Sequence, residues 1–101
     1  MTKGYWVAHG DVADVEAYKT YAAANAKPFK DFGAHFLVRG GQFQCVEGSS
    51  RARHVVLEFP SYQAALDCWH SADYQAAIKL RLPPVAQLDL VIVEGYDGVQ
   101  P

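Results

Sequence analysis

The chain has 101 residues, half of them apolar and one in five charged, a composition typical of globular domains rather than disordered segments. Nine Lys and Arg residues against eleven Asp and Glu residues give a net charge of −2, which argues against nucleic-acid binding or an anionic-membrane surface. The sequence has no signal-peptide pattern and no apolar run of transmembrane length, so we predict a cytoplasmic protein with Cys45 and Cys68 as reduced thiols. We expect a single domain over residues 1–101, with a core at 4–96 and a frayed tail at 97–101.

The first third of the chain predicts a strand followed by a long helix. Residues 5–9 are aromatic-rich and end at a Gly-Asp pair, as a strand would. Apolar residues recur every three or four positions over 15–32, which predicts a helix with Asp14 as its N-cap. Gly33 fits a left-handed C-terminal cap, whereas Pro28 predicts a kink or two helical pieces.

The middle of the chain predicts further strands. Residues 35–39 and 43–46 are extended runs, and the glycine pair within 40–42 indicates a bulge or tight turn between them. A polar loop at 48–52 leads to residues 54–59, the segment most typical of a strand.

The last third predicts two short helices and a final strand. Ser61 and Ser71 are placed as N-caps of helices whose apolar residues have helical spacing, and Pro83-Pro84 ends the second helix. Residues 88–96 read as the last strand. The order βαββαβ predicts an α+β fold, a ferredoxin-like sandwich with an antiparallel sheet and helices on one face.

Alternation along the strands predicts which side chains lie on the open face, away from the helices. We expect this face to combine apolar and charged residues: Leu37, Val56, Leu90 and Ile92 together with Arg39, Glu58 and Glu94. In the first strand the pattern leaves two possibilities, since either Tyr5, Val7 and His9 or Trp6 and Ala8 could point this way.

An open face this apolar predicts a homodimer. Monomers seldom expose large apolar patches, and pairing two sheets face to face is the simplest cover. The same burial would enclose Arg39 between the carboxylates of Glu58 and Glu94 in a cavity.

Several motifs along the chain resemble one family. They are Gly4-Tyr5-Trp6, Ala17-Tyr18, Gly33 with Leu37 to Gly41, Glu47-Gly48, Val56 to Ser61, Trp69-His70-Ser71 with Tyr74, and Glu94-Gly95. Together they resemble the DUF1330 family over about residues 4–96. The resemblance implies a dimeric α+β barrel, in which ferredoxin-like protomers place their sheets face to face. Relatives in that superfamily include small monooxygenases, muconolactone isomerases, dehydratases and chlorite-dismutase-like proteins, but the family itself implies no particular reaction.

The candidate site follows from the charged residues of the open face. Glu58 and Glu94 are the candidate catalytic residues, because a carboxylate whose pKa is raised by burial can act as a general base. The candidate substrate-binding residues are Arg39, His9, Trp6 and His54. The alternative is an ion-pair network that fixes the register of the dimer.

We predict neither a metal site nor a cofactor. The four histidines fall on separate elements without ligand spacing, and no phosphate-binding glycine motif is present. Cys68 lies among apolar helix residues and reads as a structural thiol. The leading hypothesis is a homodimer with a small-molecule cavity, suited to cofactor-independent acid/base chemistry on a small polar or anionic metabolite. The rival hypothesis is a non-catalytic binding or structural dimer module.

Overall fold

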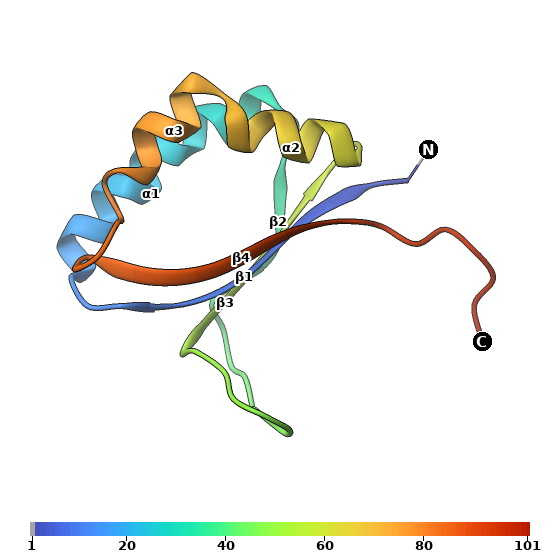
Figure 1. Ribbon diagram of the computed structural model, residues 1–101, viewed down its shortest axis with the longest axis horizontal. Helices are drawn as coiled ribbons and strands as arrows, with labels where there is room; N and C mark the ends of the chain where they lie inside the picture. The colour runs from blue at the N-terminus through green and yellow to red at the C-terminus, as the bar shows by residue number, and fades with distance from the viewer. Residues whose placement is uncertain (1) are drawn as a thin grey trace.

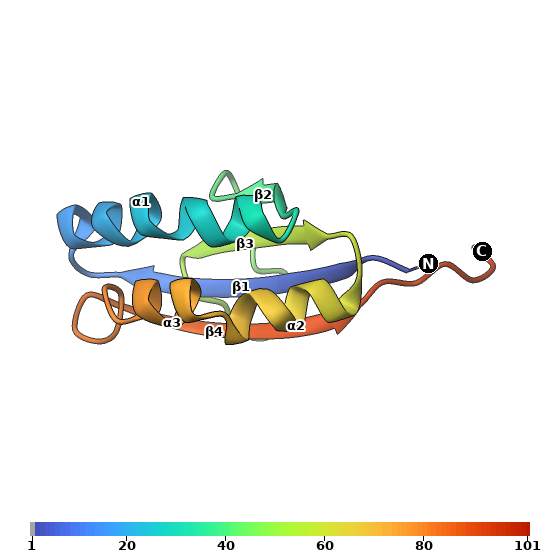
Figure 2. The same ribbon diagram turned by 90° about the horizontal axis from the view of Figure 1, so that it is seen from above.

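The computed structural model describes residues 2–101 and has the predicted βαββαβ order, with the second α unit split in two. The elements are β1 (Gly4–Val12), α1 (Val15–Asp31), β2 (His35–Arg39), β3 (Arg53–Phe59), α2 (Tyr62–His70), α3 (Ala72–Ile78) and β4 (Ala86–Glu94). The strands form one antiparallel sheet in the order β2-β3-β1-β4. All three helices cover the same face of this sheet, α1 above β2 and β3 and the α2–α3 pair above β4 (Figures 1 and 2). The ferredoxin-like prediction is therefore confirmed.

Local capping explains where the helices begin. The Asp14 side chain accepts a hydrogen bond from the Ala17 amide at 3.0 Å, so α1 starts where the sequence predicted. Ser61 caps α2 in the same way. The Ser71 hydroxyl accepts a hydrogen bond from the Tyr74 amide at 3.2 Å, which starts α3, and donates one to the Cys68 carbonyl at 2.7 Å. Ser71 therefore both ends α2 and begins α3. At the other end, α1 continues through Pro28 to Asp31, so a second helical piece does not form.

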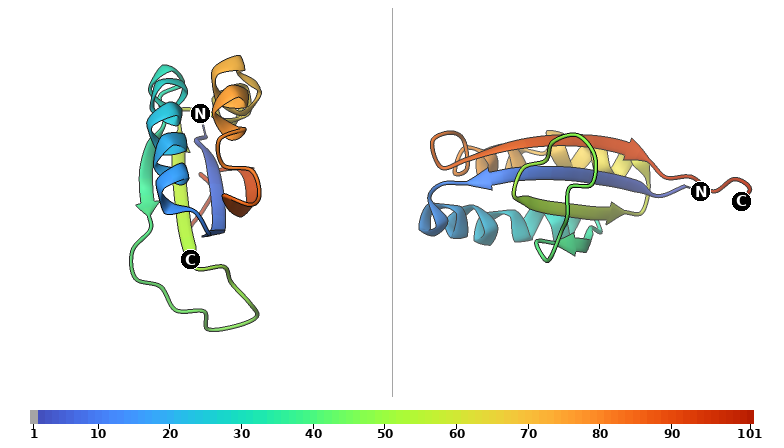
Figure 3. Two further views of the ribbon diagram at one scale, coloured as in Figure 1. Left: turned by 90° about the vertical axis from the view of Figure 1, so that its left-hand side faces the viewer. Right: turned by 90° about the horizontal axis from the view of Figure 1, so that it is seen from below.

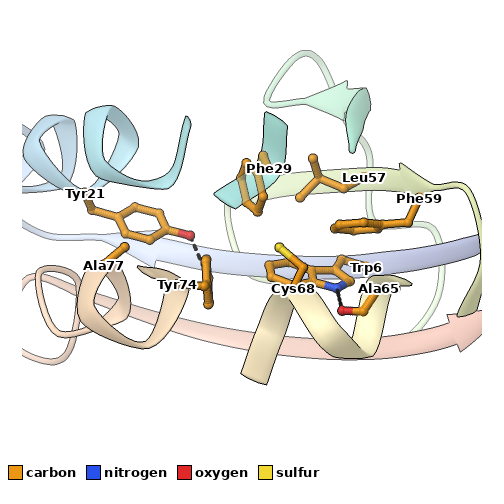
Figure 4. Close-up of a cluster of buried hydrophobic side chains, with 9 residues drawn as sticks. All are labelled: Trp6, Tyr21, Phe29, Leu57, Phe59, Ala65, Cys68, Tyr74 and Ala77. Carbon is orange, nitrogen blue, oxygen red and sulfur yellow. Dashed lines mark hydrogen bonds between the residues drawn. The ribbon is translucent and has the colours of Figure 1, made fainter. Parts of the chain in front are cut away.

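An aromatic cluster fills the space between the helices and the sheet (Figure 4). Trp6 on β1 is 1 % exposed, and its indole N–H donates to the Ala65 carbonyl of α2 at 2.9 Å. The rings of Phe29, Phe59 and Tyr74 lie within 5.4 Å of the Trp6 ring, centroid to centroid. Trp6 therefore joins α1, α2, α3 and the sheet in one core.

The predicted strand at 43–46 is wrong. Residues 40–52 form an irregular loop that extends away from the open face of the sheet (Figure 3). Gly40, Gly41 and Gly48 have φ values of 71°, 100° and 77°, a backbone region that glycine adopts readily and that breaks a regular strand. The loop is anchored at its base, where Arg51 pairs with Asp11 and Asp89.

The prediction for β3 is confirmed, and the two possibilities for the first strand are now resolved. Val55, Leu57 and Phe59 face the helices, whereas His54, Val56 and Glu58 lie on the open face. Register pairs Trp6 with Leu57 and Val7 with Val56, so Trp6 and Ala8 face the helices. The open side of β1 is formed by Tyr5, Val7, His9 and Asp11.

The predicted orientation of the last strand is wrong. Leu90 and Ile92 pair with Ala8 and Trp6 and pack against the core, so they face the helices. Val91 and Val93 lie on the open face instead and are 59 % and 46 % exposed. The polar residues of this strand give conflicting signals, because Gln87 and Asp89 share the alternation of Val91 and Val93 whereas Glu94 shares that of Leu90 and Ile92. The larger Leu and Ile side chains fill the core.

The predicted orientation of Arg39 is also wrong, because β2 contains a β-bulge. The pairing runs from Phe36 opposite Leu57 directly to Val38 opposite Val56, which leaves Leu37 as the extra residue. The alternation shifts by one position after the bulge. Arg39 then lies opposite Val55, on the helix side of the sheet. No helix within residues 2–101 is long and apolar enough to cross a membrane.

Candidate functional site

A pocket of about 40 Å³ lies between α1 and the helix side of the sheet. Most of its wall is apolar or aromatic, with contributions from Trp6, Ala8, Tyr21, Ala22, Phe29, Phe36, Val55, Leu57, Leu88 and Leu90. Four polar side chains complete it: Tyr18 and Asn25 from α1, Arg39 from β2 and Arg53 from β3. An apolar pocket with a few converging polar groups is the usual form of a small-molecule site.

The two arginines reach the pocket from neighbouring strands. Arg39 lies opposite Val55, and Arg53 is two residues before Val55 on the same face, so the pair are diagonal neighbours across the sheet. The Arg39 guanidinium lies over the Phe36 ring, 4.2 Å from its centroid. The Arg53 guanidinium lies 6.0 Å from the centroid of Tyr18. These aromatic rings hold both cations at the pocket wall.

Within residues 2–101, no carboxylate pairs with the polar side chains of the pocket. Neither Arg39 nor Arg53 forms a salt bridge there, whereas Arg51 forms two. The Nε atom of Arg53 is buried without a hydrogen-bond acceptor. Asn25 is 6 % exposed, and its amide forms no hydrogen bond in the described part of the chain. Arg39 is exposed and Arg53 is partly exposed, so both guanidinium groups are accessible to a dissolved anion. Among these three side chains, only the Arg53 Nε atom is a buried donor without an acceptor, an arrangement that native structures seldom keep.

Arg81 places a third cation behind the pocket wall. It is 6 % exposed, donates to the Tyr74 hydroxyl at 3.2 Å, and lies 5.3 Å from the centroid of the Tyr21 ring. The hydroxyls of Tyr21 and Tyr74 are themselves 2.8 Å apart. Burial and the neighbouring Tyr21 raise the pKa of Tyr74, so this phenol stays neutral and does not cancel the charge of Arg81. The region under α1 is therefore positive although the whole chain is negative.

Tyr18 is, with Tyr21, one of two titratable phenols in the pocket wall. Burial raises its pKa first, and the nearby Tyr21 raises it further, while Arg53 and Arg81 act in the opposite direction. The phenol is protonated at neutral pH and can donate a hydrogen bond to an anion.

Two surface grooves adjoin the pocket. One, of about 400 Å³, shares Asn25, Phe36 and Arg39 with it and lies between α1 and β2. The other, of about 420 Å³, shares Tyr18 and Arg53. Each arginine therefore lies where the narrow inner pocket meets a wider surface depression.

Glu58 lies on the opposite, open face of the sheet. Its carboxylate accepts a hydrogen bond from the Tyr5 hydroxyl at 2.9 Å, and its second oxygen is 3.1 Å from the His35 Nε2 atom. The hydrogen bond from Tyr5, followed by that from His35, lowers the pKa of Glu58. The same contact raises the pKa of Tyr5. Glu58 is thus held as a carboxylate, which makes it a weaker base than an unperturbed glutamate.

A polar network occupies the other end of the open face. The Arg51 amide donates to His9 Nδ1 at 3.1 Å, and the His9 Nε2 atom is 3.4 Å from the Asp89 carboxylate. The Arg51 side chain bridges Asp89 and Asp11 at 2.8 and 2.9 Å. Its hydrogen bond lowers the pKa of Asp89, and the hydrogen bond from the Ala52 amide, followed by that from Arg51, lowers the pKa of Asp11. The His54 ring lies 6.0 Å from that of His9, centroid to centroid. This network fastens the 40–52 loop to the sheet.

The structure divides the sequence-predicted site residues between two faces. Arg39 and Trp6 line the pocket, whereas Glu58, His9 and His54 lie on the open face. Glu94 pairs with Gly4 at the end of β4, on the helix side, and accepts a hydrogen bond from the Thr2 hydroxyl at 2.8 Å. The predicted cluster of Arg39 with Glu58 and Glu94 does not form.

Sequence reasoning missed three pocket residues, although signals for them exist. Arg53 continues the helix-facing alternation of Val55 and Leu57. Tyr18 and Asn25 belong to the buried stripe of α1 that also holds Phe29, with spacings of seven and four residues. A polar residue within an apolar stripe is the informative observation. Within residues 2–101, no group of three or more His, Cys, Asp or Glu side chains is arranged to hold a metal ion.

The fold and the pocket define the structural class of this chain as an α+β protein of ferredoxin-like topology with a pocket between one helix and the sheet. The family model for a domain of unknown function, DUF1330, matches residues 3–96, and the chain therefore belongs to the DUF1330 family.

Two solved structures of RPA0582 are similar to this chain. RPA0582 from Rhodopseudomonas palustris, described as a protein of unknown function, has a TM-score of 0.75 and 17 % identity, covering 99 % of this chain and 85 % of that one. The structure of methylated RPA0582 has a TM-score of 0.72 and 17 % identity, with coverage of 98 % and 84 %. Identity this low shows the shared fold alone. No curated protein matches the sequence significantly.

Proposed function

We propose that this protein is a homodimer, paired through the open face of the sheet, that binds a small polar or anionic molecule in the pocket beneath α1. The observation that carries the binding proposal is the set of unpaired polar groups at one apolar pocket: Arg39, Arg53 and Asn25. Arg39 is exposed and Arg53 is partly exposed, so both cations are open to an incoming anion, and no carboxylate lines the pocket to compete with it. We also propose a cytoplasmic location, where the free thiols of Cys45 and Cys68 stay reduced.

The dimer proposal is supported by the apolar centre of the open face. Val7, Val38, Val91 and Val93 are all more than one third exposed, and they surround the half-buried Val56. Antiparallel sheets usually keep a polar outer face when they meet water. The 40–52 loop extends on this same side and could reach a second copy placed against the sheet (Figure 3).

Binding without catalysis fits the arrangement better than acid/base chemistry by glutamate. Glu58 points away from the pocket, and its lowered pKa disfavours a role as general base. Glu94 lies at the exposed end of β4 beside Thr2. No carboxylate lines the pocket, whose titratable side chains are Arg39, Arg53, Tyr18 and Tyr21. The arginines and Tyr18 act as hydrogen-bond donors at neutral pH.

The binding proposal is tested by mass spectrometry of small molecules retained by the purified protein from a metabolite extract. The wild type should retain at least one small polar or anionic molecule and gain melting temperature from it. The double variant Arg39→Ala/Arg53→Ala should lose both effects. Lys79→Ala removes a charge from the exposed end of α3 and should behave like the wild type. Equal retention by the double variant would reject this pocket as the site.

The dimer is tested by light scattering coupled to size-exclusion chromatography. Val91→Lys should convert the dimer to a monomer, because a buried unpaired charge opposes association. Val15→Lys is the matched control, since Val15 is equally exposed, at 59 %, but lies on α1 away from the open face. A wild-type monomer at micromolar concentration, or a dimer that survives Val91→Lys, contradicts the proposed interface.

A further inference from the structure

Resting on the proposed function, we infer that the ligand is a short-chain carboxylate whose carboxylate binds between Arg39 and Arg53 and whose aliphatic body enters the inner pocket. This inference names the chemical class that the pocket accepts, which the proposed function leaves open.

The charge of the head group follows from the two guanidinium groups. Side chains at diagonal positions of neighbouring strands lie about 7 Å apart at the backbone, within reach of one shared anion for residues as long as arginine. Each planar guanidinium can donate two parallel hydrogen bonds to a carboxylate. The buried Nε of Arg53 and the Asn25 amide are further donors without acceptors in residues 2–101. A neutral molecule would form no charge-assisted hydrogen bond with either arginine.

A carboxylate fits this setting better than a phosphate. Phosphate sites usually combine side chains with several backbone amides, most often at a helix N-terminus. The first turn of α1 already directs its Ala17 amide to the Asp14 carboxylate, which would also repel a phosphate. The pocket donors are side chains of two strands and one helix.

The size of the body follows from the pocket volume. A water-sized sphere needs about 10–15 Å³ of such space, so 40 Å³ holds roughly three of them. This is room for about three to four carbon atoms beyond the carboxylate. The inner wall there is formed by Trp6, Phe29 and Leu57, which offer no hydrogen-bond partner to a polar body, since the Trp6 N–H already donates to Ala65. The expected ligands are therefore acids such as butyrate and valerate, and an aromatic acid such as benzoate is too large for the inner pocket.

The experiment is isothermal titration of the wild-type protein with a matched series of small molecules. Butyrate and valerate should bind, and butyramide, which has the same shape without the charge, should bind at least about tenfold more weakly. Acetate should bind more weakly than butyrate because it leaves the inner pocket unfilled, and benzoate and inorganic phosphate should bind more weakly than valerate. Arg53→Lys keeps the charge but loses the paired hydrogen bonds, and it should weaken butyrate binding about tenfold. Arg39→Gln provides a second test if Arg53→Lys does not fold.

The outcomes separate this inference from the proposed function. If the wild type retains some other molecule from the extract in an arginine-dependent way but ignores the carboxylate series, the ligand class is wrong and the binding function stands. If butyramide matches butyrate, or if phosphate binds more tightly than valerate, the inferred head group is overturned. If the protein retains no molecule at all, the proposed function fails together with the inference.

Discussion

Replacing Trp6 by Phe tests whether this residue is the structural centre of the core. Sequence reasoning placed Trp6 among substrate-binding residues, and the structure places it both in the pocket wall and, with 1 % exposure, among the rings of Phe29, Phe59 and Tyr74. Its indole N–H donates to the Ala65 carbonyl at 2.9 Å, which ties β1 to α2.

The expected loss of stability has two parts. Trp6→Phe removes about three buried ring atoms, and roughly 0.8 kcal/mol for each methylene-sized group gives about 2 kcal/mol. Loss of the hydrogen bond to Ala65 adds about 1 kcal/mol. The sum of about 3 kcal/mol corresponds to a decrease in melting temperature of roughly 12–24 °C for a domain of this size.

The assay is urea unfolding followed by circular dichroism, with the thermal melt as a second measure. Trp69→Phe is the matched control, because Trp69 is only partly buried and its indole N–H has no acceptor within residues 2–101. The control should lose about 1 kcal/mol. If Trp6→Phe loses less than about 1 kcal/mol of unfolding free energy, or no more than Trp69→Phe, Trp6 is not the structural centre of the core.

Two further predictions concern titratable groups. Burial raises the pKa of the Cys68 thiol to about 12. A thiol reagent at about pH 8 should therefore label only the exposed Cys45 in the native protein and both cysteines after unfolding. Two rapidly reacting thiols in the native protein would contradict the burial of Cys68. Glu58→Gln should lower the melting temperature at neutral pH, because the fold lowers the pKa of Glu58 through Tyr5 and His35 and so favours the ionised form. That stabilisation is present above the ordinary carboxyl pKa and is lost as pH falls through the lowered value, so the difference between wild type and Glu58→Gln should shrink in acid. A difference that stays constant from neutral pH to about pH 3 would refute this linkage.

The element order and helix caps could be predicted because they depend on local signals. Asp14, Ser61 and Ser71 provide hydrogen-bond acceptors next to apolar stripes, and these decide where α1, α2 and α3 begin. The faces of β3 could also be assigned, because apolar Val55 and Leu57 share one side while polar His54 and Glu58 share the other. Val56 is the one apolar residue on the polar side.

The faces of β4 could not be assigned in the same way. Within the run from Leu90 to Val93 both sides are apolar, and the flanking polar residues disagree: Asp89 favours one orientation and Glu94 the other. The register against β1 decides, and it places Ile92 beside Trp6 in the core. That choice depends on volume complementarity between distant residues, which a pattern within one strand does not contain.

A single extra residue in β2 explains why the predicted site residues Arg39 and Glu58 lie on opposite faces of the sheet. Without the bulge at Leu37, regular alternation would place Arg39 on the open face with His35 and Glu58. The bulge turns Arg39 to the helix side, where it lines the same pocket as Arg53 and where no carboxylate lines the wall. The bulge therefore decides which face of the sheet carries the Arg39 charge. The same shift leaves Glu58 to Tyr5 and His35 on the face that we propose for the dimer, so the ligand pocket and the interface are separated by the thickness of the sheet.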